Sequence, residues 1–303
     1  MFDTVTLIAF GIELHPEQLE GAKSFTYIND EGEYITKISL KKGRISYKYY
    51  LQKQILEIEL SIPKLMYGTN IKMIKESDIQ SFWIQLHNIL CQDLGISIDT
   101  EQWKVKRVDI SYNFKVDNVR MWIAEISKKD ISRRTKITYN RNETVIFKNK
   151  SSSICFYDKE KECIYKKESK EVIEQAKGIL RLEIRPASYH LKEYSSNRSA
   201  LELISKDFFT YIIEKFRIND LLIYQDEKAD IELFKVLDVM KIADIEKIMG
   251  YKVLVECIGE KMLLEKGYYK EGTLRNRKIL KEEYDKNINQ KGIKQPQLHI
   301  MLD

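Results

Sequence analysis

The chain lacks a long hydrophobic run. No apolar stretch approaches the roughly 18 residues that span a bilayer, and the N-terminal segment lacks the basic-then-apolar pattern of an export signal. These absences predict a protein that does not enter a membrane and that lies in the cytoplasm.

Clustered metal-binding side chains are also missing from the sequence. The four cysteines contain no C-x-x-C pair, and the four histidines contain no H-x-H pair. A structural zinc ion needs clustered ligands. We therefore expect reduced thiols in the core, and we exclude a histidine-based metal nuclease.

The composition is that of a soluble globular protein with an uneven charge. Of its 303 residues, 43% are hydrophobic and 32% are charged, and the net charge is +5. Eight Lys or Arg residues and only two acids lie between Lys128 and Lys150. This run is either a solvated loop or a segment that follows DNA phosphates. Its candidate DNA-binding residues are Arg133, Arg134, Lys136, Arg141, Lys148 and Lys150.

A second basic stretch runs from Lys261 to Lys294 with a helical pattern. It is either another DNA-contacting surface or an ordinary charged helix, and the sequence slightly favours the ordinary helix.

Period-two alternation predicts an α+β fold built on antiparallel strands with packed helices. The expected strands lie at 1–8, 34–40, 45–49, 56–60, 105–114, 144–147, 153–157 and 179–185. Helical spacing follows residue 77 and residue 117, and the order hints at a duplicated β-α-β unit. From residue 199 the pattern is helical only, beginning with one long amphipathic helix. We therefore expect an α/β domain over 1–198 and a helical domain over 199–303.

Three of these strands carry polar residues at positions that share a face. The alternation in residues 107–111 puts Asp109 beside Arg107, and that in 181–185 puts Glu183 between Arg181 and Arg185. These three arginines are further candidate DNA-binding residues. In 153–157, Tyr157 lies opposite the apolar Ile154 and Phe156. If the three strands are neighbours in one sheet, Asp109, Tyr157 and Glu183 converge on one face.

This combination suits cleavage of a DNA strand. Carboxylates bind Mg²⁺ or Mn²⁺, which prefer oxygen ligands and polarise a bound phosphate. The Tyr157 hydroxyl then attacks the phosphate and forms a covalent intermediate, while Lys159 lowers the pKa of the phenol or pairs with phosphate oxygens. Taken singly, each acid is better explained as part of a surface ion pair, and the functional signal lies in the combination.

The order R-x-D, Y-x-K-x-x-E and R-x-E-x-R, at residues 107–109, 157–162 and 181–185, resembles the rolling-circle replication initiators. The pattern is most similar to the gene II/X replication proteins of filamentous phages, through about residue 195, and more distantly to plasmid replication initiation factors. The resemblance implies Tyr157 as nicking residue, with Lys159 and Glu162 in its motif and Asp109 and Glu183 in metal binding. Whether Glu160 or Glu162 reaches the metal stays open.

The resemblance also implies an activity. Such proteins bind a double-stranded origin, nick one strand, leave a 3′-OH primer and later rejoin the displaced single strand. Members often act as homodimers and recruit a host helicase. The alternatives are a non-catalytic DNA-binding regulator of replication or transcription on the same scaffold and, less favoured, an RNA-processing nuclease.

Overall fold

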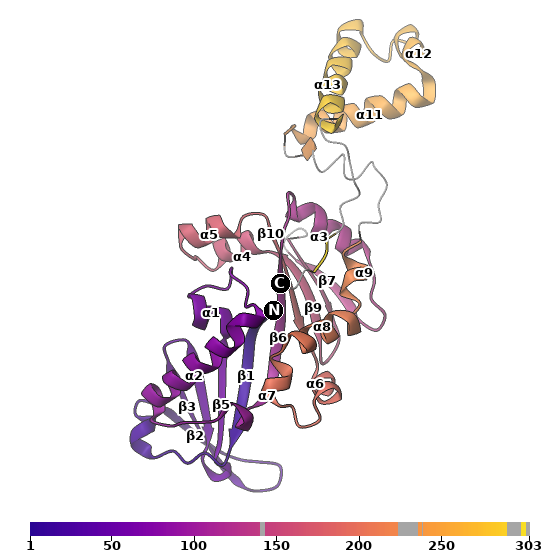
Figure 1. Cartoon of the computed structure of the whole chain (residues 1–303). Helices are drawn as coiled ribbons and strands as arrows, with labels where there is room; N and C mark the ends of the chain where they lie inside the picture. The colour runs from indigo at the N-terminus through magenta and orange to yellow at the C-terminus, as the bar shows by residue number, and fades with distance from the viewer. Residues whose placement is uncertain (140–142, 224–235, 238, 290–297, 301–303) are drawn as a thin grey trace. The chain divides into compact units, whose positions relative to one another are not determined.

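The computed structural model describes residues 1–139, 143–223, 236–237, 239–289 and 298–300. Two compact units make up the chain (Figure 1). The first runs from Met1 to Leu222 and includes Leu298–Asp303, and the second runs from Ile223 to Gln297.

The first unit is built on one antiparallel sheet, which in the described residues has ten strands in the order β2-β3-β4-β5-β1-β6-β10-β9-β8-β7. The strands are β1 (Phe2–Phe10), β2 (Lys23–Ile28), β3 (Tyr34–Lys42), β4 (Ile45–Tyr50), β5 (Ile55–Ser61), β6 (Lys104–Lys115), β7 (Thr135–Tyr139), β8 (Thr144–Lys148), β9 (Ser153–Asp158) and β10 (Ile179–Arg185). The predicted α+β class is confirmed, and every predicted strand is present.

The sheet consists of two halves with the same strand order. In the first half, β1 pairs with β5, the last strand of the meander β2–β5. In the second half, β6 pairs with β10, the last strand of the meander β7–β10. The two halves meet where β1 pairs with β6. This order supports the hinted duplication, with a five-strand unit in place of β-α-β. The edge strands β2 and β7 were not expected, because edge strands bury little and lack a clear apolar alternation.

Helices pack on the apolar face of the sheet. Helix α3 contacts β8, β9 and β10, and α7 contacts β6. The α-helices of the first unit are α1 (Ile62–Tyr67), α2 (Ile79–Leu94), α3 (Val119–Lys128), α4 (Lys159–Tyr165), α5 (Lys170–Ala176), α6 (Ser188–Tyr194), α7 (Ala200–Leu203), α8 (Lys206–Lys215) and α9 (Ile218–Leu221). Short 3-10 helices lie at Pro16–Leu19, Leu51–Lys53, Glu76–Asp78 and Thr100–Gln102.

The region after residue 198 differs from the prediction in two ways. The expected long helix is broken into α7 and α8, because Ser205 caps α8 by accepting a hydrogen bond from the amide of Phe208 at 3.2 Å. Both helices belong to the sheet unit, and the Phe209 ring packs edge-on against Phe2 of β1. The boundary therefore follows Leu222. Helical periodicity predicted these helices but carries no information on which surface they cover.

The second unit contains the helices α11 (Ile242–Ile258), α12 (Glu260–Glu265) and α13 (Glu271–Asn289). Its core cluster comprises Val236, Ile245, Ile248 and Tyr284. In the part of the chain that the structure describes, no helix combines the length and apolar character needed to cross a membrane.

Replacement of Phe209 by Ala tests whether α8 is integral to the sheet unit. The side chain is fully buried against Phe2, so Phe209→Ala should lower the free energy of unfolding by about 3–5 kcal/mol in urea titrations. Leu201→Ala, at a position 44% exposed on α7, is the matched control and should change it by less than about 0.5 kcal/mol. Equal effects of the two substitutions would contradict the packing of α8 on the sheet.

Candidate active site

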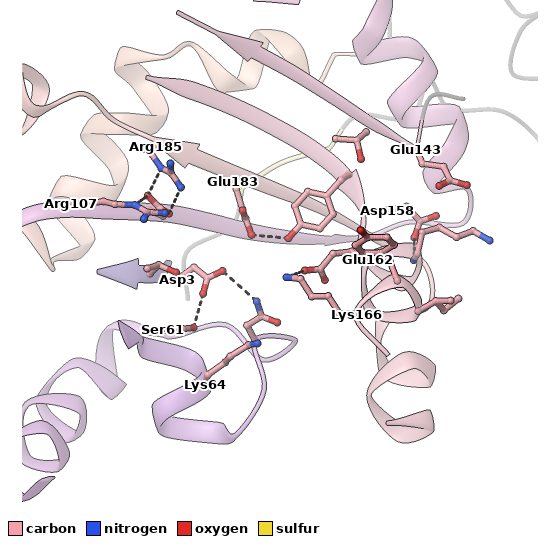
Figure 2. Close-up of a pocket in the computed structure, with 18 residues that line it drawn as sticks. Asp3, Ser61, Lys64, Arg107, Glu143, Asp158, Glu162, Lys166, Glu183 and Arg185 are labelled. Atoms are coloured by element: carbon pink, nitrogen blue, oxygen red, sulfur yellow. Dashed lines mark hydrogen bonds and ion pairs between the residues drawn. The ribbon is translucent and has the colours of Figure 1, made fainter. Parts of the chain in front are cut away.

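The three strands that carry the predicted site are neighbours in the sheet. Strand β10 lies between β6 and β9, with Glu183 opposite Ser111 on one side and Cys155 on the other. The side chains of Asp109, Tyr157 and Glu183 line one pocket of about 730 Å³ (Figure 2). The adjacency that the sequence argument required is therefore present.

The Tyr157 hydroxyl donates a hydrogen bond to Oε1 of Glu183 at 2.7 Å. Tyr157 is 9% exposed, and burial, together with the charge of Glu183, raises the pKa of the phenol well above its ordinary value. Burial also raises the pKa of Glu183. The neighbouring thiol of Cys155 is a poor competing nucleophile, because burial and then Glu183 raise its pKa to about 12.

The guanidinium of Arg181 connects the acids at the base of the pocket. It donates to Oδ2 of Asp3 at 2.8 Å, to Oδ1 of Asn113 at 2.9 Å, to the backbone oxygen of Asn70 at 3.1 Å and to Oε1 of Glu183 at 3.3 Å. Arg181 is only 1% exposed. This position does not fit the DNA contact expected from the sequence, and we assign Arg181 a positioning role instead.

Asp3 of β1 is a pocket residue that sequence reasoning missed. Its carboxylate accepts a hydrogen bond from Ser61 at 2.7 Å as well as the one from Arg181. Burial alone would raise the pKa of Asp3, but Arg181 and the Ser61 hydrogen bond outweigh burial and hold the pKa below its usual range. The available signal was an acid at the start of an apolar strand, although the sequence does not show that β1 lies beside β6.

Asp109 is held between two arginines. Its Oδ1 accepts from Nε of Arg107 at 2.9 Å and from Nε of Arg185 at 3.2 Å, and both guanidinium groups also reach Oδ2 (Figure 2). Arg107 and Arg185, both expected to contact DNA, line the pocket together with this acid. The pair of cations compensates the negative charge of Asp109, which is 7% exposed.

Lys159 and Glu162 lie on α4, which begins directly after β9. The fully buried Lys159 ammonium pairs with Glu162 at 2.7 Å and lies 5.8 Å from the centroid of the Tyr157 ring. Lys166 pairs with the same carboxylate. Glu162 lines the pocket and Glu160 is outside its lining, so the geometry favours Glu162 in the alternative that the sequence left open.

The pocket offers the right kind of donor for Mg²⁺ or Mn²⁺ without a preformed three-acid centre. Asp3, Asp109, Glu162 and Glu183 all line it with oxygen donors. Among the described residues, no group of three or more His, Cys, Asp or Glu is close enough to hold a metal ion. Asp3 and Glu183, however, accept hydrogen bonds from one guanidinium. Mg²⁺ commonly binds one or two carboxylates and completes its shell with water and phosphate oxygens, so the oxygen donors of this pocket are of the type that it takes.

Most of the predicted basic residues after α3 gather at a second cavity. This cavity has a volume of about 610 Å³ and is lined by Arg133, Arg134, Thr135, Lys148, Asn149 and Lys150. Lys136 instead pairs with Asp130 at 2.9 Å, and the guanidinium of Arg134 also lies over the Phe216 ring. Arg141 lies outside the described residues. The cavity lies at the end of the β7–β8 hairpin, where Thr135 pairs with Lys148.

The fold and the pocket define an α+β protein with a tyrosine, carboxylates and cations gathered in one pocket. Residues 1–208 match the model of a family described as the N-terminal part of a phage replication-associated protein, the gene II protein. The match covers more than half of the chain, so the chain belongs to this family of phage replication-associated proteins.

Comparison with other proteins adds little to this assignment. A solved structure, the TBP of Methanococcus jannaschii, is similar over 72% of this chain and 97% of its own length, with 8% identity and a TM-score of 0.31. No curated protein matches the chain.

Removal of the buried cation should destabilise the first unit in a pH-dependent way. Arg181→Met leaves the Asp3 carboxylate buried without its partner, and we expect a loss of about 3–5 kcal/mol at pH 7. In the parent chain the pKa of Asp3 is lowered, so its contribution is present above the unfolded pKa and is lost as the pH falls through the folded value. In Arg181→Met, burial without the cation raises the pKa of Asp3. Acidification then neutralises the buried carboxylate and reduces the destabilisation.

Urea titrations at pH 7 and pH 4.5 should therefore show a smaller difference between the parent chain and Arg181→Met at the lower pH. Arg185→Met, at a half-exposed side chain, is the control and should cost less than about 1 kcal/mol at either pH. A difference for Arg181→Met that grows on acidification would contradict the role of Arg181 as the partner of Asp3.

Proposed function

We propose that this replication protein nicks one strand of origin DNA with the hydroxyl of Tyr157. The observation that carries the proposal is the 2.7 Å hydrogen bond from that hydroxyl to Glu183 inside a polar pocket. The phenolic oxygen attacks the phosphorus and expels the 3′ oxygen of the preceding nucleotide, which takes up a proton and leaves a 3′-OH primer. The 5′ phosphate stays on Tyr157, and the reverse attack by a 3′-OH rejoins the strand.

Glu183 is the residue placed to receive the phenolic proton. The hydroxyl already points its proton at Oε1, and the raised pKa of Glu183 makes it a better base than an exposed carboxylate. The high pKa of Tyr157 keeps the phenol protonated until the substrate is bound. The charge of Arg181 acts in the opposite direction and lowers the pKa of Tyr157, which offsets part of the cost of forming the phenolate.

Cations at the pocket are suited to the charge that develops on the phosphate. Arg185 and Lys166 both have half-exposed side chains, and each pairs with an acid that lines the pocket. A phosphate oxygen can take over part of these pairings as negative charge accumulates during attack. Lys159 is fully buried against Glu162, so we give it the role of fixing Glu162 and the start of α4 beside Tyr157.

Asp3 would hold Mg²⁺ or Mn²⁺, and Asp109, Glu162 and Glu183 are the ligands that the sequence predicts. A bound cation lowers the pKa of its carboxylate ligands, so Glu183 would receive the phenolic proton only where it does not itself bind the ion. The ion, when bound, polarises the scissile phosphate and offsets its charge. The proposed substrates are double-stranded origin DNA and its displaced single strand. A host helicase partner and a homodimer stay predictions from the family resemblance.

Replacement of Tyr157 by Phe tests the chemistry. Wild-type protein incubated with a supercoiled plasmid carrying the cognate origin and with Mg²⁺ or Mn²⁺ should give nicked circles and a covalent protein–DNA adduct. Tyr157→Phe should reduce both to the level without protein, and a chelator should do the same to the wild type. The matched control is Tyr165→Phe, because Tyr165 lines the same pocket and is 87% exposed, and this variant should keep the adduct.

Each of the other outcomes would indicate a different nucleophile or a different function. An adduct that survives Tyr157→Phe and disappears in Tyr165→Phe would move the nucleophile to Tyr165. Full-rate nicking by Tyr157→Phe without an adduct would indicate a water nucleophile. Wild-type protein that binds the origin without cutting it would be the non-catalytic regulator, and cleavage restricted to RNA would indicate an RNA nuclease.

The basic cavity gives a separate prediction for DNA affinity. Lys148 and Lys150 are exposed and line the cavity with two arginines, so Lys148→Glu/Lys150→Glu should weaken DNA binding at least tenfold and lower the slope of log K against log salt by about two. The control is Lys136→Glu, whose parent lysine is already paired with Asp130, and its slope should fall by less. Gel shifts at several salt concentrations measure the affinity and the slope. An unchanged slope in the double variant would show that this cavity does not contact DNA.

A further inference from the structure

The second unit has a feature that nicking at Tyr157 does not use. Helices α12 and α13 are joined by the five residues Lys266–Lys270, and Gly267 makes the turn with a φ of 70°. The amide of Tyr269 closes the turn by donating to the oxygen of Leu263 at 3.0 Å. Buried Leu263 and Leu274 anchor the two helices. The two helices are thus joined by a short, hydrogen-bonded turn.

Helix α13 presents one face to the core and the opposite face to solvent. Leu274 and Tyr284 are buried, and Leu280 packs against the core cluster. Arg275 is exposed and Ile279 is 53% exposed. With 3.6 residues per turn these two lie on the side of the helix away from the core. The 19-residue helix therefore has a side that faces away from the core of this unit.

The charge along this region is strongly polarised. Six Lys or Arg residues and one acid lie between residues 266 and 281, whereas residues 282–289 contain three acids and one lysine. Glu271 in the first turn and Lys286 in the last turn agree with the helix dipole. The dipole acts only near the helix ends, so it does not explain the charge order of the residues between them. Within the described residues, Lys266, Lys270 and Arg275 form no ion pair with an acid, whereas Lys278 pairs with Glu260 at 2.6 Å. An anionic partner does explain the order.

We propose that the turn and the first half of α13, defined by Lys266, Lys270, Arg275 and Lys278, form a surface that binds duplex DNA. The major groove of B-DNA is wide enough to admit an α-helix, and Lys and Arg side chains along a helix face neutralise DNA phosphates. The surface deepens the proposed function by supplying a contact to the duplex around the origin. Of the two interpretations that the sequence left open for this stretch, the structure favours the DNA surface over an ordinary charged helix.

The test compares two charge reversals on one helix in the full-length chain. Arg275→Glu alters the proposed surface, and Lys286→Glu makes the same reversal 11 residues later on the same side of α13. The probes are a 30-base-pair duplex and one strand of it alone. Arg275→Glu should weaken duplex binding about tenfold and lower the salt slope by about one. Lys286→Glu should change duplex affinity less than twofold, and single-strand affinity should change little in both.

Lys270→Glu is a second variant at the residue whose backbone oxygen accepts from the Leu274 amide at the start of α13. A negative charge there favours the helix dipole, so unfolding of α13 would not account for a loss seen in Lys270→Glu. Equal effects of Arg275→Glu and Lys286→Glu, or an unchanged duplex affinity in Arg275→Glu and Lys270→Glu, would overturn the inference. Nicking of a single-stranded origin oligonucleotide separates this inference from the proposed function. Arg275→Glu should still cleave this oligonucleotide. If the wild-type protein binds duplex DNA through this surface but never cuts DNA, the proposed nicking is refuted and this inference is not.

Discussion

The site depends on one buried cation, the guanidinium of Arg181. It holds Asp3 from the first half of the sheet and Glu183 and Asn113 from the second half. A buried carboxylate without such a partner would be protonated or would destabilise the fold. The cation therefore allows two acids to lie close together at the junction of β1 and β6, beside the hydroxyl of Tyr157.

The charges around two further acids in the pocket agree with the proposal that it takes a phosphate. Asp109 has two arginine partners, and Glu162 has two lysine partners. Each acid is thus already compensated, and the cations that compensate Asp109 and Glu162 include half-exposed groups able to turn to a substrate. A phosphodiester that enters the pocket brings the negative charge that these groups can accept, together with oxygen ligands that would complete the shell of a divalent ion.

The sequence predicted the part of the site that follows from period-two alternation. Asp109, Glu183 and Tyr157 share a face because alternate residues of adjacent strands do so, and their strands were recognisable individually. Asp3 was missed because its place depends on the pairing of β1 with β6, which no local pattern encodes. Arg181 looked like a surface DNA contact, since alternation separates two faces of a strand but does not show that the polar face is itself covered. The boundary after Leu222 was missed for a related reason, because periodicity shows a helix and not its packing partner.

The duplicated sheet places the chemistry in one half only. Counted from the first residue of each strand, Glu57 and Glu59 of β5 occupy the positions that Arg181 and Glu183 occupy in β10. Lys48 lies opposite Glu57 as Tyr157 lies opposite Arg181, and the two residues Lys48 and Glu57 form an ion pair at 2.9 Å. The first half thus has the same strand arrangement and one equivalent acid, Glu59. It has the ammonium group of Lys48 where the second half has the phenol of Tyr157. Of the two equivalent strand positions, the one in the second half carries the phenol, so in the proposed nicking the reverse attack by a 3′-OH releases the oxygen of Tyr157.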